Sequence, residues 1–250
     1  MRMEKKSILS FVGNGDGFAT KRSNTCAYLE AGKDLIVIDC GFDAFAKLRD
    51  VGLFDGKANV HFFITHLHCD HAGSLAVAVS YLYHKVFDGC ASRIRVHFPN
   101  ASIVDFLRAQ GVGEDEYYFN INRWDEIEIG DDYKLEYIFE ENDHDDNLSV
   151  NGISGTWSVE LVSTGRYNIY YGGDSAGVKD RITRTRIYDE IYHEVCSVKT
   201  QGHTSYEELK DAFSHFTRSE RARIWLMHMD DDFDEQQAVD DGFNVTATCL

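Results

Sequence analysis

Apolar residues occur in short runs along the first half of the chain, separated by polar turns. Residues 25–30 and 34–39 form two such runs across a three-residue connection, a spacing typical of a β-hairpin. Residues 75–86 follow another rhythm, with apolar side chains four, seven and eleven positions after the first, which predicts a helix. By the same criteria we expect strands at residues 7–12, 60–64 and 94–98, and helices at residues 43–51 and from residue 101 or 102 to Gly111.

The second half of the chain repeats this alternation with less helix. Thr204 and Glu207 have the spacing of a capping box, which predicts a helix extending to Phe216. A weaker helical pattern covers residues 234–241. Strands are predicted at residues 133–139, 157–163, 167–171, 223–227 and 244–248. Strands packed on strands with helices outside predict an α/β fold of four layers in the order αββα.

One stretch, Thr-His-Leu-His-Cys-Asp-His-Ala-Gly, lies where the fourth predicted strand becomes a helix. In an extended segment, residues two apart point the same way, so His66 and His68 can present two imidazoles to one metal ion. Asp70 and His71 come after the turn and must point elsewhere. The spacing therefore predicts two metal ions side by side with water between them. The alternative, a solvated histidine-rich loop, does not explain why these residues follow a buried strand so closely.

Length and composition favour one domain over residues 1–250. The chain has a single proline and no Ser/Gly-rich or low-complexity stretch that could act as a linker. No run reaches the 18 apolar residues of a membrane span, and the N-terminal run is too short and polar for a signal peptide. We expect a soluble cytoplasmic protein with no membrane partner. The six cysteines show no C-x-x-C pair, which favours reduced thiols.

The formal net charge is −17, which is unfavourable for binding a long polyanion by counterion release. Long nucleic acid is therefore not expected as a partner, whereas a short or cyclic nucleotide held by metal ions remains compatible with the charge. The acidic residues concentrate in two runs, at 140–146 and 230–235. Most of these residues are interpreted as solvated loops, although each run lies at or beside a histidine that is a candidate ligand.

Three further residues follow apolar strands, where ligands gather at strand ends. Asp174 comes after two glycines that let the backbone approach the site, and its carboxylate could bridge both ions. His228 is the natural remaining ligand of the second ion, and His144 would complete a three-histidine set on the first. Each of the three alone could be an ordinary turn or loop residue. With the motif they complete a set of seven: His66, His68, Asp70, His71, His144, Asp174 and His228.

The order of these residues resembles the metallo-β-lactamase-fold hydrolases over essentially the whole chain. Within them the chain is most similar to the ribonuclease Z-type phosphodiesterases, because position 174 is aspartate where true lactamases carry cysteine. The stretch His203-Thr204-Ser205-x-x-Glu-Leu resembles the histidine motif that those enzymes place near the scissile phosphate. The resemblance implies the αββα sandwich, a site for two Zn²⁺ ions with Mn²⁺ as the alternative, and a homodimer.

One departure from that family is informative. The tRNA-processing members carry an inserted arm between the equivalents of His144 and Asp174, and here that interval is 30 residues, largely used by two strands. The missing arm and the negative charge argue against tRNA and for a small nucleotide substrate. Compact acidic members of this kind include the viral anti-Pycsar enzymes, which hydrolyse signalling nucleotides of bacterial defence. The resemblance thus implies a phosphodiesterase acting on 3′,5′-cyclic nucleotides, in the host cytoplasm if the protein is viral.

Two residues are candidates for direct roles in catalysis. Asp70 can orient the nucleophile as well as bind metal, and His203, at the start of a helix, is the candidate general acid for the leaving oxygen. The alternative for His203 is a helix-flanking surface histidine. The remaining histidines, His61, His84, His97, His193 and His215, are interpreted as structural, and Cys69 need not be a ligand.

Other functions remain open from the sequence alone. A hydrolase of the same fold could act on tRNA 3′ ends, a lactone or a thioester. A non-catalytic protein could retain the fold and sequester a nucleotide. The complete ligand set argues against the non-catalytic alternative, because buried charged ligands without metal are costly to retain.

Overall fold

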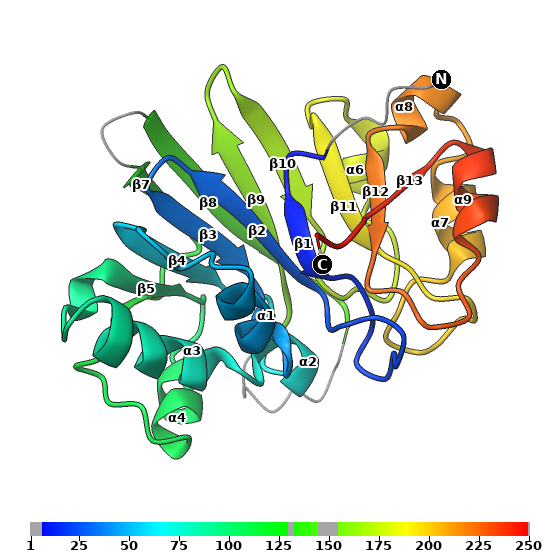
Figure 1. Ribbon diagram of the computed structural model, residues 1–250. Coiled ribbons are helices and arrows are strands. Elements are labelled where there is room, and N and C mark those ends of the chain that lie inside the picture. Colours follow the sequence, from blue (N-terminus) through cyan, green and yellow to red (C-terminus); the bar gives the residue numbers. More distant parts are fainter. Residues whose placement is uncertain (1–6, 130–132, 145–154, 250) are drawn as a thin grey trace.

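Two β-sheets face each other, and helices cover their outer surfaces (Figure 1). The computed structural model describes residues 7–129, 133–144 and 155–249, so the chain start and the Asp145 and Asp146 end of the first acidic run lie outside the described residues. The layer order is helices, sheet, sheet, helices. The α/β prediction of an αββα sandwich is confirmed.

The first sheet changes from antiparallel to parallel along its width. Its strands lie in sequence order: β1 (Ser10–Gly13), β2 (Cys26–Ala31), β3 (Asp34–Ile38), β4 (Asn59–Phe63), β5 (Ile94–His97) and β6 (Tyr118–Asn120). The pairs from β1 to β3 are antiparallel, and those from β3 to β6 are parallel. The parallel pairing places the carboxyl ends of β3 and β4 at one edge of the sheet.

The second sheet has the same change of direction. Its order is β13 (Asn244–Val245), β12 (Ile224–Met227), β11 (Glu190–Glu194), β10 (Tyr167–Tyr171), β9 (Trp157–Ser163), β8 (Tyr133–Glu141) and β7 (Trp124–Ile129). The pairs from β10 to β13 are parallel, so the carboxyl ends of β10, β11 and β12 also share an edge. Ligands of such sheets bind beyond the carboxyl ends of the strands.

Helices form the outer layers (Figure 1). On the first sheet these are α1 (Ala44–Asp50), α3 (Leu75–Tyr81) and α4 (Ser102–Ala109), and a π-helical turn, η1 (Leu82–Val86), extends α3. On the second sheet they are α6 (Asp180–Arg184), α7 (Tyr206–Ala212), α8 (Arg218–Arg221) and α9 (Glu235–Asp241). The short helix α2 (Cys69–Ala72) follows β4, and the 3₁₀ turn η2 (Ala91–Arg93) precedes β5.

Two apolar clusters hold the layers together. The larger fills the space between the sheets and extends under the helices of the first sheet. Between the sheets, the ring of Phe63 on β4 meets Tyr137 on β8 with centroids 5.1 Å apart. The smaller lies under the helices of the second sheet and includes Leu209 and Phe213 packed with Leu226. Burying this apolar surface is the main favourable contribution to folding.

The sequence predicted most strands with errors of a few residues at their ends. The hairpin of β2 and β3 is confirmed, with Gly32 in the left-handed region (φ 63°) at its turn. The capping box is displaced by one residue from the prediction, because Ser205 and Glu208 form it rather than Thr204 and Glu207. The first and last strands are shorter in the structure than predicted. The sequence patterns did not predict β6, β7, α6, β11 and α8.

Two expectations about the chain's chemistry can be compared with the structure. All six cysteines are free thiols, as predicted. Among the described residues, every helix is too short or too polar to serve as a membrane span.

His61 and His97 form a buried pair on neighbouring strands. Nδ1 of His61 lies 3.1 Å from Nε2 of His97, and the outer nitrogen of each ring is buried without a hydrogen-bond partner. Burial, with a smaller contribution from the charge of Arg95, lowers the pKa of His61 to about 3. Burial also holds the pKa of His97 well below its usual value. Both rings are therefore neutral in the folded protein.

We expect this pair to make the protein sensitive to mild acid. The unfolded chain takes up protons near pH 6.5, whereas the folded pair does not. The contribution of this pair to the free energy of unfolding is therefore fully present above pH 6.5. Below pH 6.5 it falls by up to about 1.4 kcal/mol per histidine for each pH unit. Thermal unfolding at pH 7 and pH 5 should show a smaller drop in Tm for His61→Leu/His97→Phe than for the wild type. The exposed His84→Leu control should behave as the wild type, and equal drops in all three proteins would contradict the prediction.

Candidate metal centre

The first predicted ligand group lies together where β4 ends. Nε2 of His66 is 3.0 Å from Nδ1 of His68, and Nε2 of His144 is 3.4 Å from the same atom. His66 is fully buried, whereas His68 and His144 are partly exposed. The last residue enters from the segment after β8, as the sequence predicted.

The second group gathers around the start of α2. Oδ2 of Asp70 is 3.3 Å from Nε2 of His71 and 3.3 Å from Nε2 of His228, and the two imidazole nitrogens are 3.2 Å apart. His71 and His228 are buried, and Asp70 is partly exposed. The turn between His68 and Asp70 thus separates the two groups, as expected from the spacing.

Asp174 lies between the groups. Its Oδ2 is 3.3 Å from Nε2 of His71, 3.6 Å from Nε2 of His144 and 3.8 Å from Nε2 of His66. Gly173 has a left-handed φ of 60°, and a Cβ there would lie 2.7 Å from the carbonyl oxygen of Trp157. Glycine therefore allows the backbone after β10 to reach this position.

This geometry fits metal ions. Ligand bonds of about 2.0–2.2 Å in a tetrahedral arrangement place donor atoms roughly 3.3–3.6 Å apart, close to the spacing of both groups. Oδ1 of Asp174 is buried without a hydrogen-bond partner among the described residues, as expected of a carboxylate that faces a cation. Imidazole nitrogens with a few carboxylates are a donor set suited to zinc.

Polar groups behind the candidate ligands orient the rings. Nδ1 of His71 lies 2.9 Å from Oδ2 of Asp39, and Nδ1 of His144 lies 2.6 Å from the carbonyl oxygen of Gly202. Nδ1 of His66 lies 3.1 Å from Oγ1 of Thr65. Such contacts fix the tautomer, so that Nε2 of each of these rings points into the site.

Asp39 was not identified as a site residue from the sequence. It immediately follows the buried strand β3, so the rule that identified Asp174 and His228 also applied to it. Its backbone is left-handed (φ 62°), as is that of His228 (φ 54°). Such conformations cost about 1–3 kcal/mol and cluster at functional sites.

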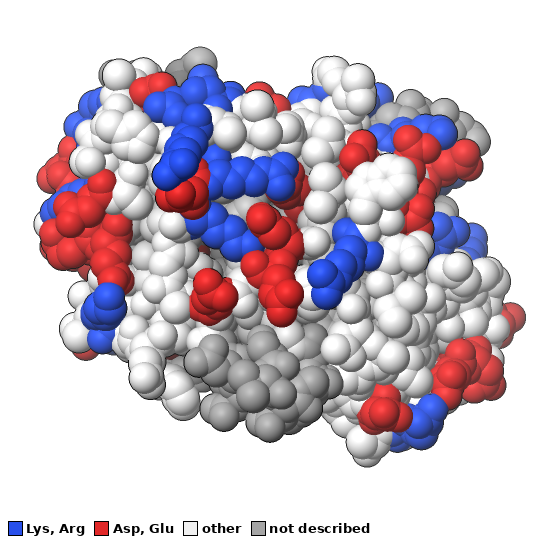
Figure 2. All heavy atoms as spheres, turned by 180° about the vertical axis from the view of Figure 1, so that it is seen from behind, with Lys and Arg blue, Asp and Glu red and all other residues white. Residues whose placement is uncertain are grey.

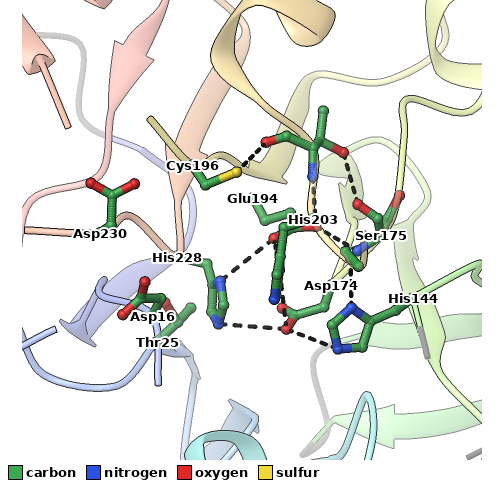
Figure 3. A network of polar contacts seen from close by, with 12 residues as sticks. Asp16, Thr25, His144, Asp174, Ser175, Glu194, Cys196, His203, His228 and Asp230 are labelled. Carbon is green, nitrogen blue, oxygen red and sulfur yellow. Dashed lines mark hydrogen bonds and ion pairs between the residues drawn. The ribbon is translucent and has the colours of Figure 1, made fainter. Parts of the chain in front are cut away.

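His203 lies close to Asp174, Glu194 and His228 (Figure 3). Its Nδ1 lies 2.6 Å from Oε2 of Glu194, and its ring stacks on that of His228 with centroids 5.3 Å apart. Burial lowers the pKa of His203, but the hydrogen bond and charge of Glu194 and the charge of Asp174 outweigh it, and the net pKa is raised. His203 therefore carries a proton more readily than a free histidine.

Glu194 at the end of β11 was also missed. Its Oε1 accepts hydrogen bonds from the N–H groups of Ser175 (2.6 Å) and Thr204 (3.3 Å), while Oε2 faces His203. Thr204 donates its hydroxyl to the carbonyl oxygen of Ser175 (2.8 Å), so it joins two site loops instead of capping α7. The sequence carried no alternating pattern around Glu194, because β11 is buried on both faces and three of its five residues are polar.

Comparison with known proteins identifies the family. The family described as anti-Pycsar protein Apyc1 matches residues 7–248. The chain belongs to this family. The prediction of a metallo-β-lactamase-fold hydrolase of the anti-Pycsar kind is thereby confirmed.

Individual relatives agree with the family assignment. The anti-Pycsar protein Apyc1 of Bacillus phage vB_BsuM-Goe3 is 25% identical over 244 residues, covering 91% of this chain and 90% of the relative. The metallo-β-lactamase-fold protein YhfI of Bacillus subtilis has a TM-score of 0.69 at 14% identity, with 95% of each chain covered. The short form of human tRNase Z has a TM-score of 0.65 at 17% identity, covering 96% of this chain and 95% of its own. The two structures support the fold.

Metal content tests the ligand assignment directly. We expect the wild type to bind two zinc ions per chain, and Asp174→Ala to bind fewer, because Oδ2 of Asp174 lies close to both groups. Inductively coupled plasma mass spectrometry of the purified proteins measures the ratio. His84→Ala, which changes an exposed histidine away from the site, should retain the wild-type ratio. Full metal content in Asp174→Ala would show that this carboxylate is not a shared ligand.

Asp39 offers a separate test of the support behind His71. Asp39→Asn retains the size of the side chain but removes the negative charge behind the ring. We expect zinc affinity to fall about 10- to 100-fold, the usual effect of removing such a partner. Competition with a fluorescent zinc chelator measures the affinity. Asp50→Asn, at an exposed position of α1, is the control, and an unchanged affinity in Asp39→Asn would contradict the assigned role.

Proposed function

We propose that this protein is a phosphodiesterase that uses two Zn²⁺ ions, with Mn²⁺ as the alternative, to hydrolyse 3′,5′-cyclic nucleotides. The observation that carries the proposal is the position of Oδ2 of Asp174, 3.3–3.8 Å from histidines of both candidate ligand groups. The groups are His66, His68 and His144 on one side and Asp70, His71 and His228 on the other.

The bound ions would supply a water of lowered pKa and neutralise the oxygens of a phosphodiester. The protein's own part lies in orientation and proton transfer. Asp70 faces the second group from the partly exposed side, where it can accept a hydrogen bond from the attacking water. Nδ1 of His203 is committed to Glu194, which leaves Nε2 to donate a proton to the leaving oxygen. A leaving alkoxide needs that proton, and such general-acid assistance contributes about 10²–10⁴-fold.

Charge supports a small substrate. Basic side chains lie beside acidic ones on the face shown in Figure 2, and the chain carries a net charge of −17. Such a surface attracts a long polyanion poorly, whereas one phosphodiester can be held by ions at the site. The names of the relatives add the biological context, so we infer a role in removing the cyclic nucleotides of bacterial defence. The homodimer and the cytoplasmic location stay predictions.

Two substrates separate the roles of metal and acid. Purified zinc-loaded protein should open 3′,5′-cyclic AMP and cleave bis(p-nitrophenyl) phosphate, and His66→Ala should lose both activities. His203→Ala should slow cyclic AMP hydrolysis by about 10²–10⁴-fold. It should affect bis(p-nitrophenyl) phosphate much less, because p-nitrophenolate leaves without a proton. Nucleotide products are measured by chromatography and p-nitrophenolate by absorbance.

A histidine outside the candidate site serves as the control. His215→Ala changes a histidine whose Nε2 lies 3.0 Å from the carbonyl oxygen of Thr183 on α6, and it should leave both rates unchanged. Turnover of a lactone without cleavage of either phosphodiester would replace the proposal by the esterase-type alternative. Intact recovery of bound cyclic AMP would favour the nucleotide-sequestering one. Equal losses on both phosphodiesters in His203→Ala would remove the general-acid role.

A further inference from the structure

Two phenylalanines are exposed to an unusual degree. Phe18 is 94% exposed and Phe42 is 77% exposed. Single exposed apolar residues are common, so exposure alone assigns no role. Their place in the fold distinguishes them, because each belongs to a loop that touches the candidate ligand Asp70.

Asp70 is packed against both loops, through its carboxylate on one side and its backbone carbonyl on the other. A Cβ added at Gly17, the neighbour of Phe18, would lie 2.9 Å from Oδ2 of Asp70. A Cβ at Gly41, the neighbour of Phe42, would lie 2.0 Å from the carbonyl oxygen of Asp70. Each phenylalanine therefore directly follows a glycine that is packed against Asp70.

The loop that carries Phe18 is held in place by hydrogen bonds. Oδ1 of Asp16 accepts from the N–H groups of Phe18 (2.8 Å) and Ala19 (2.6 Å). The N–H of Asp16 donates to the carbonyl oxygen of Met229 (3.1 Å), the residue after His228, and Figure 3 shows Asp16 beside that histidine. Asp16 thus links the backbone of Phe18 to the residue after the candidate ligand His228, while the ring of Phe18 is exposed.

The loop that carries Phe42 is tied to the first one. The side chain of Asn24 donates to the carbonyl oxygen of Asp16 (3.3 Å), and its N–H donates to Oδ1 of Asp43 (3.2 Å). The carboxylate of Asp231 holds the far end of the first loop by accepting from Thr20 (2.8 Å). The two aromatic residues therefore form one rim, here called the Phe18–Phe42 rim, on the Asp70 side of the site.

We propose that the Phe18–Phe42 rim binds the nucleobase of the substrate, with Phe18 stacking on its face. This inference rests on the proposed function and identifies the part of the substrate beyond the phosphate. A cyclic nucleotide whose phosphate lies at the metal centre extends its base away from it by the width of a ribose, and the base is its flat, uncharged part. Because the chain carries a net charge of −17, it can bind the uncharged base without the electrostatic repulsion that an anionic group would meet. Stacking on an aromatic ring has that property.

A substrate without a base isolates this contact. We compare 3′,5′-cyclic AMP with the 3′,5′-cyclic phosphate of methyl riboside, which presents the same phosphate and sugar. Phe18→Ala should lower kcat/KM for cyclic AMP about 5- to 100-fold, chiefly by raising KM, the range expected for losing one base-stacking contact. It should leave kcat/KM for the base-free substrate unchanged.

Conservative variants and a distant control sharpen the test. Phe18→Trp should retain activity on cyclic AMP, and Phe18→Leu should show most of the loss because it retains apolar bulk without an aromatic face. Tyr118→Ala changes another exposed aromatic residue, 57% exposed on β6, and should leave both substrates unaffected. The fluorescence of Phe18→Trp should fall when cyclic AMP is added to metal-loaded protein, and this binding readout does not require turnover.

Several results would overturn the inference. Equal losses on both substrates would mean that Phe18 acts through the metal centre. An unchanged KM for cyclic AMP in Phe18→Ala, or unchanged fluorescence of Phe18→Trp with saturating cyclic AMP, would show no base contact. A change of oligomeric state in size-exclusion chromatography without a change in KM would assign the rim to a second copy of the chain. A wild type that opens neither substrate would reject the proposed function instead, and the fluorescence of Phe18→Trp would still decide the base contact.

Discussion

Three carboxylates are buried at one edge of the sandwich, those of Asp39, Asp174 and Glu194. Burying a charge is costly unless it is paired and hydrogen-bonded. Here each carboxylate faces one or more imidazoles, and Glu194 also accepts two backbone N–H groups. The charges at this edge compensate one another, so the loops that supply these groups are coupled energetically.

The topology explains why such a set can form at one place. Strands β3 and β4 run parallel, as do β10, β11 and β12, and every one of them is followed or ended by a group of the site. The two sheets present these ends at the same edge, where the short helix α2 adds Asp70 and His71. The left-handed backbone of Asp39 and His228 then turns each side chain inward at a cost in strain that the packed sheets can support.

The site residues that the sequence identified are those whose pattern lies within one short stretch of chain. The four motif residues were identified from spacing within one short stretch, and Asp174 and His228 from a strand followed directly by a ligand type. Glu194 could not be found in this way, because β11 is fully buried and carries polar residues that only the folded structure satisfies. The capping box was misplaced by one residue because Thr204 and Ser205 are chemically alike in sequence, and only the contact of Thr204 with Ser175 separates them.

The two candidate ligand groups draw on both sheets, and this connectivity has a consequence for folding. His66, His68, Asp70 and His71 belong to the first half of the chain, whereas Asp174 and His228 follow strands of the second sheet. Metal ions bound by both halves would act as long-range cross-links, because their ligands are far apart in sequence. Such cross-links would oppose separation of the two sheets, because ligands from both would have to stay together around the ions. The free energy of unfolding would then rise with the concentration of free metal, because the unfolded chain lacks the assembled site.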